Sequence, residues 1–364
     1  MANITEERAK ELILARMSKA HGKKVREGVR FLVEPTQVQR VEQVMRQQFA
    51  FLEKITTRYT DQKSEQILSM LDGESVAQRT VGNTRRPVEP GDFGHRQYNC
   101  VDVESDVIIP WARLLKWGML EGEVYNDWRA WLIRARARDR LRSGFYGQSY
   151  NANISSDRAT YPRLEDVQKG WFQYMIENFP AQFLGLTPAN NTRGYTITPV
   201  KVGEGGDFVN MGQLVQYLLD HVMNYIYASD SGIEAICGRS LVSEDKQRLL
   251  GFGTEPIQQS AAEQLMMSAT YATRPIDIPD EMPATGLMVC NPKVLECIIQ
   301  GNSIRESVVD DPRVKGLVDY QWMQRDYVVN TPTAWAGVLP GTILTKNLAG
   351  EWSAAEAWGI DPVV

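Results

Sequence analysis

The chain has 364 residues, of which 43% are apolar, and its formal net charge at pH 7 is −5. This length suffices for two or three compact units, and the apolar content excludes a largely disordered chain. No window approaches the run of about 18 apolar residues that a membrane-spanning helix needs. The first residues lack the apolar core of a signal peptide, so we expect a cytoplasmic location. The four cysteines have no metal or redox spacing and are expected to be reduced and buried.

Residues 1–31 are predicted to form a basic amphipathic helix followed by a tether. An apolar stripe that contains Leu12 and Met17 predicts the helix, and Gly22 among like charges predicts its end. This segment contains eight Lys/Arg and four Asp/Glu, so it carries +4 and residues 32–364 carry −9. Two interpretations remain open: a first helix that packs on its own domain, or a detachable segment that acts on another molecule. The acidic remainder suits a container wall better than tight wrapping of nucleic acid.

The next segments predict a helix and a long hairpin. Thr36–Ile55 has helical apolar spacing, and residues 61–72 contain a short helical patch. Residues 73–110 are predicted to form a hairpin whose return strand alternates apolar and acidic side chains from Val101 to Ile109. The candidate inter-subunit contacts are the charges of this hairpin: Arg79, Arg85, Arg86, Asp102, Glu104 and Asp106. These charges pair either within the hairpin or with a neighbouring copy.

Glu123–Arg142 gives the clearest helical pattern in the chain. A stripe that includes Trp128, Trp131 and Leu132 predicts its buried side. Arginines cover the remainder: Arg129, Arg134, Arg136, Arg138, Arg140 and Arg142. They could contact phosphates, but a solvated or salt-bridged face is favoured, because arginine pairs bidentately with carboxylates.

The second half of the chain mixes helices and strands. We expect helices at 164–179, 209–227, 258–271 and 292–299. We expect strands at 195–200, 233–237, 286–290 and within 322–339. A tight turn at 203–207 would place Asp207 as the cap of the following helix. The mixed pattern of 207–300 differs from the strand-rich end, which places a domain boundary near each end of that interval.

The sequence contains no recognisable catalytic constellation. GxxxxGK[ST], GxSxG and HExxH are absent, and the three histidines lie in three different segments. The glycine-rich stretch Gly203–Gly206 lacks the spacing of a phosphate-binding loop and is better explained as a turn. We therefore expect no enzymatic activity, no metal and no cofactor.

An ordered set of short motifs carries a resemblance to a known family. The motifs are Val33-Glu34-Pro35, Gly170-Trp171, Val202-Gly203 with Gly205-Gly206-Asp207, Gly238-Arg239 with Leu241, and Asp326-Tyr327-Val328-Val329. Together they resemble the major capsid proteins of peduovirus-type tailed bacteriophages, a branch of the Hong Kong 97 capsid fold. The hairpin region, 143–160 and 243–285 depart from the family pattern.

The resemblance implies an α+β fold with an N-arm, an extended E-loop, a peripheral domain built on a long spine helix, and an axial domain. For this chain it places a scaffold-interacting segment at 1–31, the N-arm at 32–60, the E-loop region at 61–110, the peripheral domain with its spine helix at 111–206, the axial domain at 207–305, and the returning peripheral strands with the C-terminus at 306–364.

The resemblance also implies a function. Such proteins self-assemble as hexamers and pentamers into an icosahedral shell that encloses double-stranded DNA without sequence specificity. The implied partners are an internal scaffold and protease and a portal protein, with no membrane. After procapsid formation the protease removes the N-terminal segment, and the matching junction here is Phe31–Leu32. We expect Leu12 and Met17 to contact the scaffold, and the chain to reside in the virion after assembly in the bacterial host cytoplasm.

Two alternatives remain from other classes. One is an encapsulin-type compartment shell, which the basic N-terminal segment disfavours because a cargo shell needs no removable handle. The other is a DNA-binding protein that uses the arginine-rich helix, which would bind DNA tightly and with strong salt dependence.

Overall fold

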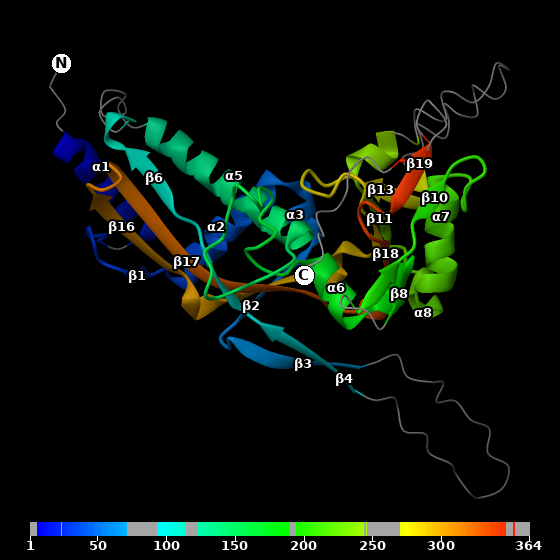
Figure 1. Cartoon of the computed structure of the whole chain (residues 1–364). Helices are drawn as coiled ribbons and strands as arrows, with labels where there is room; N and C mark the ends of the chain where they lie inside the picture. The colour runs from blue at the N-terminus through cyan, green and yellow to red at the C-terminus, as the bar shows by residue number, and fades with distance from the viewer. Residues whose placement is uncertain are drawn as a thin grey trace, which may run out of the picture.

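The long strand β17 (Gly316–Val329) lies at the centre of the larger of two main sheets in the computed structural model (Figure 1). Its last residues, Val328 and Val329, are buried, as is common for β-branched residues in covered strands. The structure describes residues 6–22, 24–70, 93–113, 123–189, 194–243, 245, 270–346 and 352–353.

Four strands pair antiparallel with the two edges of β17. β16 (Arg305–Asp311) and β15 (Leu295–Gln300) follow one another along one edge. β6 (Val107–Pro110) and β5 (Val101–Glu104) follow one another along the other. β1 (Phe31–Leu32) adds to β16, and β2 (Thr56–Thr60) adds to β15. Segments from both ends of the chain therefore build one sheet.

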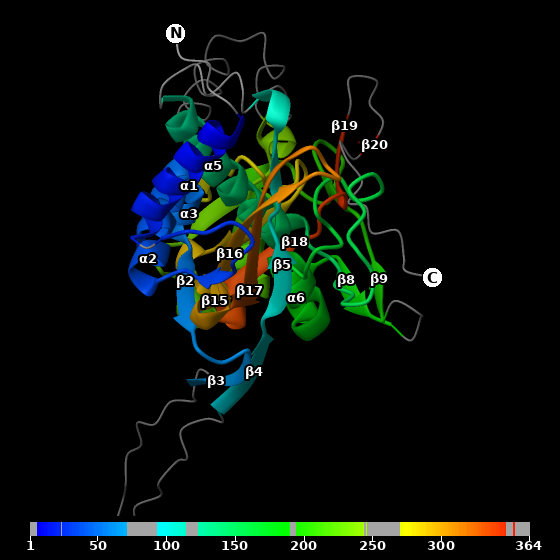
Figure 2. The same ribbon diagram turned by 90° about the vertical axis from the view of Figure 1, so that its left-hand side faces the viewer.

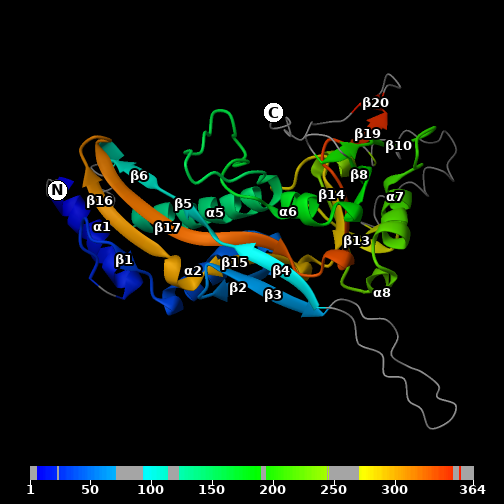
Figure 3. The same cartoon turned by 60° about the horizontal axis from the view of Figure 1, so that its bottom comes forward.

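Helices pack against this larger sheet and form the main core with it. They are α2 (Pro35–Gln48), α3 (Ala50–Lys54), α5 (Glu123–Tyr146) and α6 (Trp171–Asn178). Figure 3 shows α5 alongside β17; its 24 residues span about 36 Å. Leu141 and Phe145 of α5 meet Trp171 of α6 in the core. The Trp171 indole N–H donates to the Glu296 carbonyl at 3.1 Å, so this buried polar atom is satisfied.

The second main sheet lies at the opposite end of the molecule (Figure 1). Its strand order is β12-β13-β11-β14-β18-β7. The bounds are Thr270–Tyr271, Arg274–Asp277, Glu234–Cys237, Leu287–Cys290, Trp335–Val338 and Phe183–Leu184, in that order. α7 (Met211–Tyr217) continues as a π-helical turn, Leu218–Val222, and α8 (Tyr225–Ala228) follows. Buried residues of α7 and β11 share a second core, which makes this end a packed unit of its own.

Smaller pairings complete the described chain. β3 (Ser64–Met70) and β4 (Phe93–Asn99) form a hairpin that projects away from the larger sheet (Figures 1 and 3). β8 (Leu186–Pro188) pairs with β9 (Tyr195–Ile197), and β10 (Val200–Val202) pairs with β19 (Ile343–Lys346), which pairs with β20 (Trp352–Ser353). Figure 2 shows α1 (Glu6–His21) beside α2 and α5, on the side of the molecule remote from β19.

Most predicted helices and strands are present, with shifted ends. The helix predicted at 123–142 continues to Tyr146, the strands predicted at 233–237 and 286–290 are β11 and β14, and all four cysteines are free and buried. The helix predicted at 36–55 is interrupted at Phe49, whose extended backbone separates α2 from α3. Most of the helix predicted at 258–271 lies outside the described residues, and its last two residues form β12.

Several local predictions are wrong. The helix predicted at 164–179 begins only at Trp171, and the predicted helices at 67–71 and 292–299 are largely the strands β3 and β15. The cap of α7 is Asn210, whose side chain accepts from the Gln213 N–H, whereas Asp207 accepts from the Lys201 N–H. In each case tertiary pairing or a competing local hydrogen bond outweighs the helical pattern.

The pairing of two segments also differs from the prediction. Residues 101–110, expected as the return strand of a hairpin, instead pair with β17. β15 belongs to the larger sheet although it lies within 207–305, and β18 belongs to the second sheet although it lies within 306–364. Sheet membership therefore crosses the predicted boundaries, because strands of similar composition can pair with either sheet.

Candidate functional site

The N-terminal helix α1 packs on the larger sheet of its own chain. Ile13 and Met17 are buried, together with Val25 of the following tether, against Ile109, Val308 and Leu317 of β6, β16 and β17. Trp111 and Trp128 are partly buried at the same contact. Met17 has only 4% of its surface exposed, so in this conformation it is a core residue.

Polar contacts fix α1 and its tether on the sheet. Lys10 Nζ lies 3.0 Å from Asp310 Oδ2 and 2.7 Å from Glu27 Oε2. Burial lowers the pKa of Lys10, but the hydrogen bonds and charges of Glu27 and Asp310 outweigh it, and the pKa is raised. At the other end of α1, His21 Nε2 lies 3.1 Å from Glu306 Oε2. The Gly28 N–H donates to the Val308 carbonyl at 2.8 Å.

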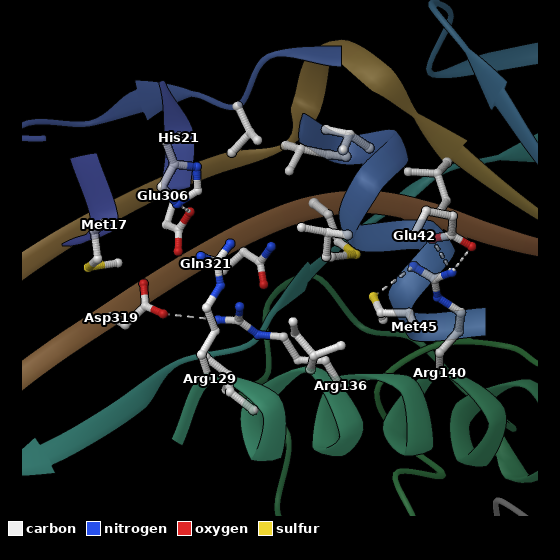
Figure 4. Close-up of a pocket in the computed structure, with 18 of the residues that line it drawn as sticks. Met17, His21, Glu42, Met45, Arg129, Arg136, Arg140, Glu306, Asp319 and Gln321 are labelled. Atoms are coloured by element: carbon white, nitrogen blue, oxygen red, sulfur yellow. Dashed lines mark hydrogen bonds and ion pairs between the residues drawn. The ribbon is translucent and has the colours of Figure 1, made fainter. Parts of the chain in front are cut away.

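A layer of charged side chains lies beneath α1 (Figure 4). Arg136 Nη2 of α5 is 3.3 Å from Asp319 Oδ2 of β17, and Asp319 neighbours Glu306. Burial and, next to it, the charge of Glu306 together raise the pKa of Asp319 to about 8, although the charge of Arg136 acts to lower it. Burial also acts to raise the pKa of Glu306, but the hydrogen bond and charge of His21 prevail and lower it. Asp319 therefore holds a proton at neutral pH, and Glu306 is a carboxylate.

This layer borders a small pocket of about 80 Å³ between α1, α2, α5 and the sheet (Figure 4). His21, Glu306, Asp319, Gln321 and Arg136 line it. His21 Nδ1, Asp319 Oδ1 and Gln321 Oε1 have no hydrogen-bond partner among the described residues. The volume and these polar atoms suit ordered water.

A second buried ion pair joins α5 to α2 (Figure 4). Arg140 Nη1 lies 2.7 Å from both Oε1 and Oε2 of Glu42, and both residues are buried. Burial acts to raise the pKa of Glu42, but the charge and hydrogen bonds of Arg140 outweigh it and lower the pKa. Both groups are therefore charged, and they lock two helices together.

The arginine-rich face of α5 is largely paired within the chain. Besides Arg136 and Arg140, Arg142 Nε lies 2.9 Å from Glu281 Oε2, and Arg138 Nε lies 3.9 Å from Glu281 Oε1. This confirms the salt-bridged interpretation for Arg138, Arg140 and Arg142, whereas Arg136 lies beside the protonated Asp319. The predicted apolar stripe is partly wrong, because Trp131 is 58% exposed while Arg140 is buried. Arg136 and Arg140 point to the buried side of α5, and the spacing of apolar residues could not predict this because arginine is a polar residue.

The predicted junction Phe31–Leu32 lies in the short strand β1 at the edge of the larger sheet. Phe31 is partly buried and its ring meets the His21 ring edge-on at 5.2 Å, whereas Leu32 is 45% exposed. Of the predicted scaffold contacts, Met17 faces the sheet, and Leu12 lies on α1 with a side chain outside the described set.

The predicted inter-subunit charges are divided. Arg79, Arg85 and Arg86 lie outside the described residues. The three carboxylates accept hydrogen bonds from β17 of their own chain: Asp102 from Gln324 Nε2 at 2.7 Å, Glu104 from Trp322 Nε1 at 3.1 Å, and Asp106 from the Gln321 N–H at 3.3 Å. Burial raises the pKa of Asp106. The structure therefore gives these carboxylates partners in β17, with hydrogen bonds rather than ion pairs among the described residues.

Within the described residues, no group of three or more His, Cys, Asp or Glu side chains could hold a metal ion. The described part of the chain also has no helix with the length and apolar content needed to cross a membrane.

Comparisons with known proteins agree with the architecture. A family model for P2-family phage major capsid proteins matches residues 11–338. The chain is 24% identical over 332 residues to the capsid protein of Escherichia phage P2, covering 89% of each chain. It is 23% identical over 338 residues to the major capsid protein of Serratia phage KSP20, covering 90% of this chain and 94% of the relative.

A solved structure shares the fold. A chain of the satellite phage P4 procapsid, a structure that includes the size determination (Sid) protein, superposes with a TM-score of 0.71 at 21% identity. The match covers 94% of this chain and 99% of that chain. The predicted α+β, Hong Kong 97-like capsid fold is thereby confirmed.

The fold is that of a capsid subunit, a structural class of protein that implies no enzymatic activity. More particularly, the chain belongs to the P2 family of phage major capsid proteins. It is a component of the virion that self-assembles into the capsomers of an icosahedral shell.

Proposed function

We propose that this chain assembles on an internal scaffold into a procapsid, loses residues 1–31 by a cut between Phe31 and Leu32, and then encloses double-stranded DNA. The observation that carries the proposal is the placement of the N-terminal segment. It sits on the outside of a sheet that is complete without α1, and it is joined through the edge strand β1.

The junction has features that a protease requires. Proteases bind extended backbone, and β1 is extended, at an edge, and only two residues long. Leu32 on the carboxyl side of the junction is exposed. The main core includes Val33, whereas Ile13, Met17 and Val25 belong to a separate cluster with residues of the sheet. The cut would take away the N-terminal side of that cluster and leave the buried residues of the main core in place.

The scaffold contact through Leu12 and Met17 requires a change of conformation. Met17 is buried on its own sheet, so it can reach a scaffold only when α1 leaves that sheet. We propose that scaffold and sheet compete for this stripe. The host cytoplasm is the proposed place of assembly, and the scaffold, protease and portal protein are the proposed partners besides sister copies.

The packaged DNA is proposed to meet an acidic wall. Residues 32–364 carry a net charge of −9, which keeps the shell from adhering to its contents. The paired state of Arg138, Arg140 and Arg142 supports this, because these arginines are engaged by carboxylates of their own chain.

Electron microscopy of two chains tests the proposal. Residues 1–364 and residues 32–364 are each produced with the scaffold protein of the same phage. We expect closed shells of uniform diameter from the full chain, and misshapen or aggregated particles from the shortened chain. Uniform, normal shells from residues 32–364 would overturn the scaffold role of the N-terminal segment.

A further inference from the structure

We infer that the face beneath α1 is a peptide-binding site whose ligand is α1 itself, and that α1 stays bound there after its covalent link to the body is cut. The docking is independent of the proposed scaffold. If the natural cut falls at Phe31–Leu32, as the proposed function has it, the inference states that the excised helix remains bound to the shell subunit. In this part the inference rests on the proposed function.

The contact has the form of a helix laid on a specific face. Lys10, Ile13, Met17 and His21 fall on one stripe of α1, because their spacings of three and four residues match the helical repeat. All four contact the body: Lys10 by an ion pair, His21 by its polar contact with Glu306, and Ile13 and Met17 by burial. Recognition of an amphipathic helix commonly uses such anchors at i, i+3, i+4 and i+7 spacing.

The face is complementary in charge as well as in shape. Asp310 and Glu306 lie at the two ends of β16 and meet Lys10 and His21, which are about 16 Å apart along α1. Val308 lies between these two acidic positions on β16, and Leu317 and Ile109 lie level with Asp310 on the next two strands.

The covalent link contributes little to this contact. The residues that join α1 to the sheet include Gly22 and Gly28, both with positive φ, and exposed Lys24. Glu27, Asp310 and Glu306 all lie on the body side of a cut made just before Lys24. Such a cut therefore preserves the contacts of Lys10 and His21 with these carboxylates and the burial of Ile13 and Met17.

A site-specific nick in the full chain tests the inference. A recognition sequence for an added protease is inserted before Lys24, and the unassembled protein is cut at about 10 μM, a concentration at which micromolar binding retains a fragment. We expect the fragment that carries α1 to co-elute with the body in size-exclusion chromatography. We also expect a labelled synthetic peptide of residues 1–23 to exchange into the site.

Matched variants separate docking from general loss of fold. Met17→Asp places a charge in the apolar contact and should lower the retained fraction at least about tenfold. Ala15→Asp adds the same charge at an exposed position of α1 and should leave retention unchanged. Circular dichroism of the nicked body checks that the fold persists. Complete loss of the unmodified fragment from a folded body, or equal retention of the two variants, would overturn the inference, whatever shells the chain forms.

Discussion

Arg140 and Glu42 form an enclosed, forked ion pair in which one arginine nitrogen lies 2.7 Å from each carboxylate oxygen. Arg140 has 3% of its surface exposed and Glu42 has 6%. Arg46 Nε and Thr57 Oγ1 also reach Glu42 Oε1, each at 3.3 Å. The pair thus ties α2, within the predicted N-arm, to the long helix α5 and to β2.

Removing one partner of this pair should cost far more than replacing both. Glu42→Ala leaves the Arg140 guanidinium buried without its carboxylate, and we expect the free energy of unfolding to fall by about 3–5 kcal/mol. The double variant Glu42→Leu with Arg140→Met should recover most of that loss, because apolar side chains need no counter-charge. Urea unfolding of the original chain and of these two variants measures the difference. A loss below about 1 kcal/mol for Glu42→Ala would contradict the assignment.

Asp319 should make stability fall as pH rises. Its pKa is raised to about 8 by burial and by Glu306, so the folded chain holds a proton that the unfolded chain releases above the ordinary carboxyl range. The stabilising proton is present at low pH and is lost as pH rises through the folded value. The loss is therefore expected between about pH 4, where the unfolded carboxyl releases its proton, and about pH 8, the folded value.

Asp319→Asn should flatten this dependence, because the amide can donate to Glu306 at every pH. The decline in unfolding free energy over the same interval should shrink by roughly 1–2 kcal/mol. Asp220→Asn, at an exposed carboxylate of the π-helical turn, is the control and should keep the slope of the original chain. Equal slopes for all three proteins would refute the role of Asp319.

Gly238 lies where a neighbouring backbone approaches too closely for a side chain. A Cβ there would collide with the carbonyl oxygens of Pro283 and Ala284, and the Gly238 N–H donates to the Gly286 carbonyl at 2.8 Å. Gly238→Ala should lower the free energy of unfolding by about 1–3 kcal/mol. Gly301→Ala, where the nearest atom is 4.0 Å away, should be close to neutral. Thermal unfolding compares the two, and a neutral Gly238→Ala would disprove the close approach.

Charge reversal at the predicted E-loop should affect assembly more than folding. We expect the combined change of Arg79, Arg85 and Arg86 to Glu to block shell formation, because these arginines are proposed to meet carboxylates of a neighbouring copy. The melting temperature of the unassembled chain should change little. Sedimentation of assembly reactions and a thermal scan give the two readouts. Unimpaired assembly would argue against the contact.

The periodicity of apolar residues predicted those helices and strands that are defined by their own residues alone. The helix α5 and the buried strands β11 and β14 have a clear period or an uninterrupted apolar run, and the structure contains all three. Gly203 and Gly205 have positive φ in the turn that the sequence predicted at 203–207. The family resemblance of the ordered motifs predicted the capsid fold. One motif glycine, Gly170, lies where a Cβ would collide with the backbone of Gly144 and Ser143.

The spacing of apolar and charged residues could not predict contacts between segments that are far apart in the sequence. Nothing in residues 101–110 says that they pair with β17 more than 200 positions later, as Asp102 does with Gln324. The buried charges were missed for the same reason: Arg136 and Arg140 resemble surface arginines until Asp319 and Glu42 are placed beside them. The docking of α1 was one of two open interpretations, and the burial of Met17 favours intramolecular packing in this conformation.

The mass of the subunit in DNA-filled particles tests the central claim most directly. Intact-mass spectrometry of the chain extracted from such particles should give residues 32–364, with Leu32 at the N-terminus, while the same measurement on empty procapsids should give residues 1–364. An intact chain of 364 residues inside DNA-filled particles would contradict the account.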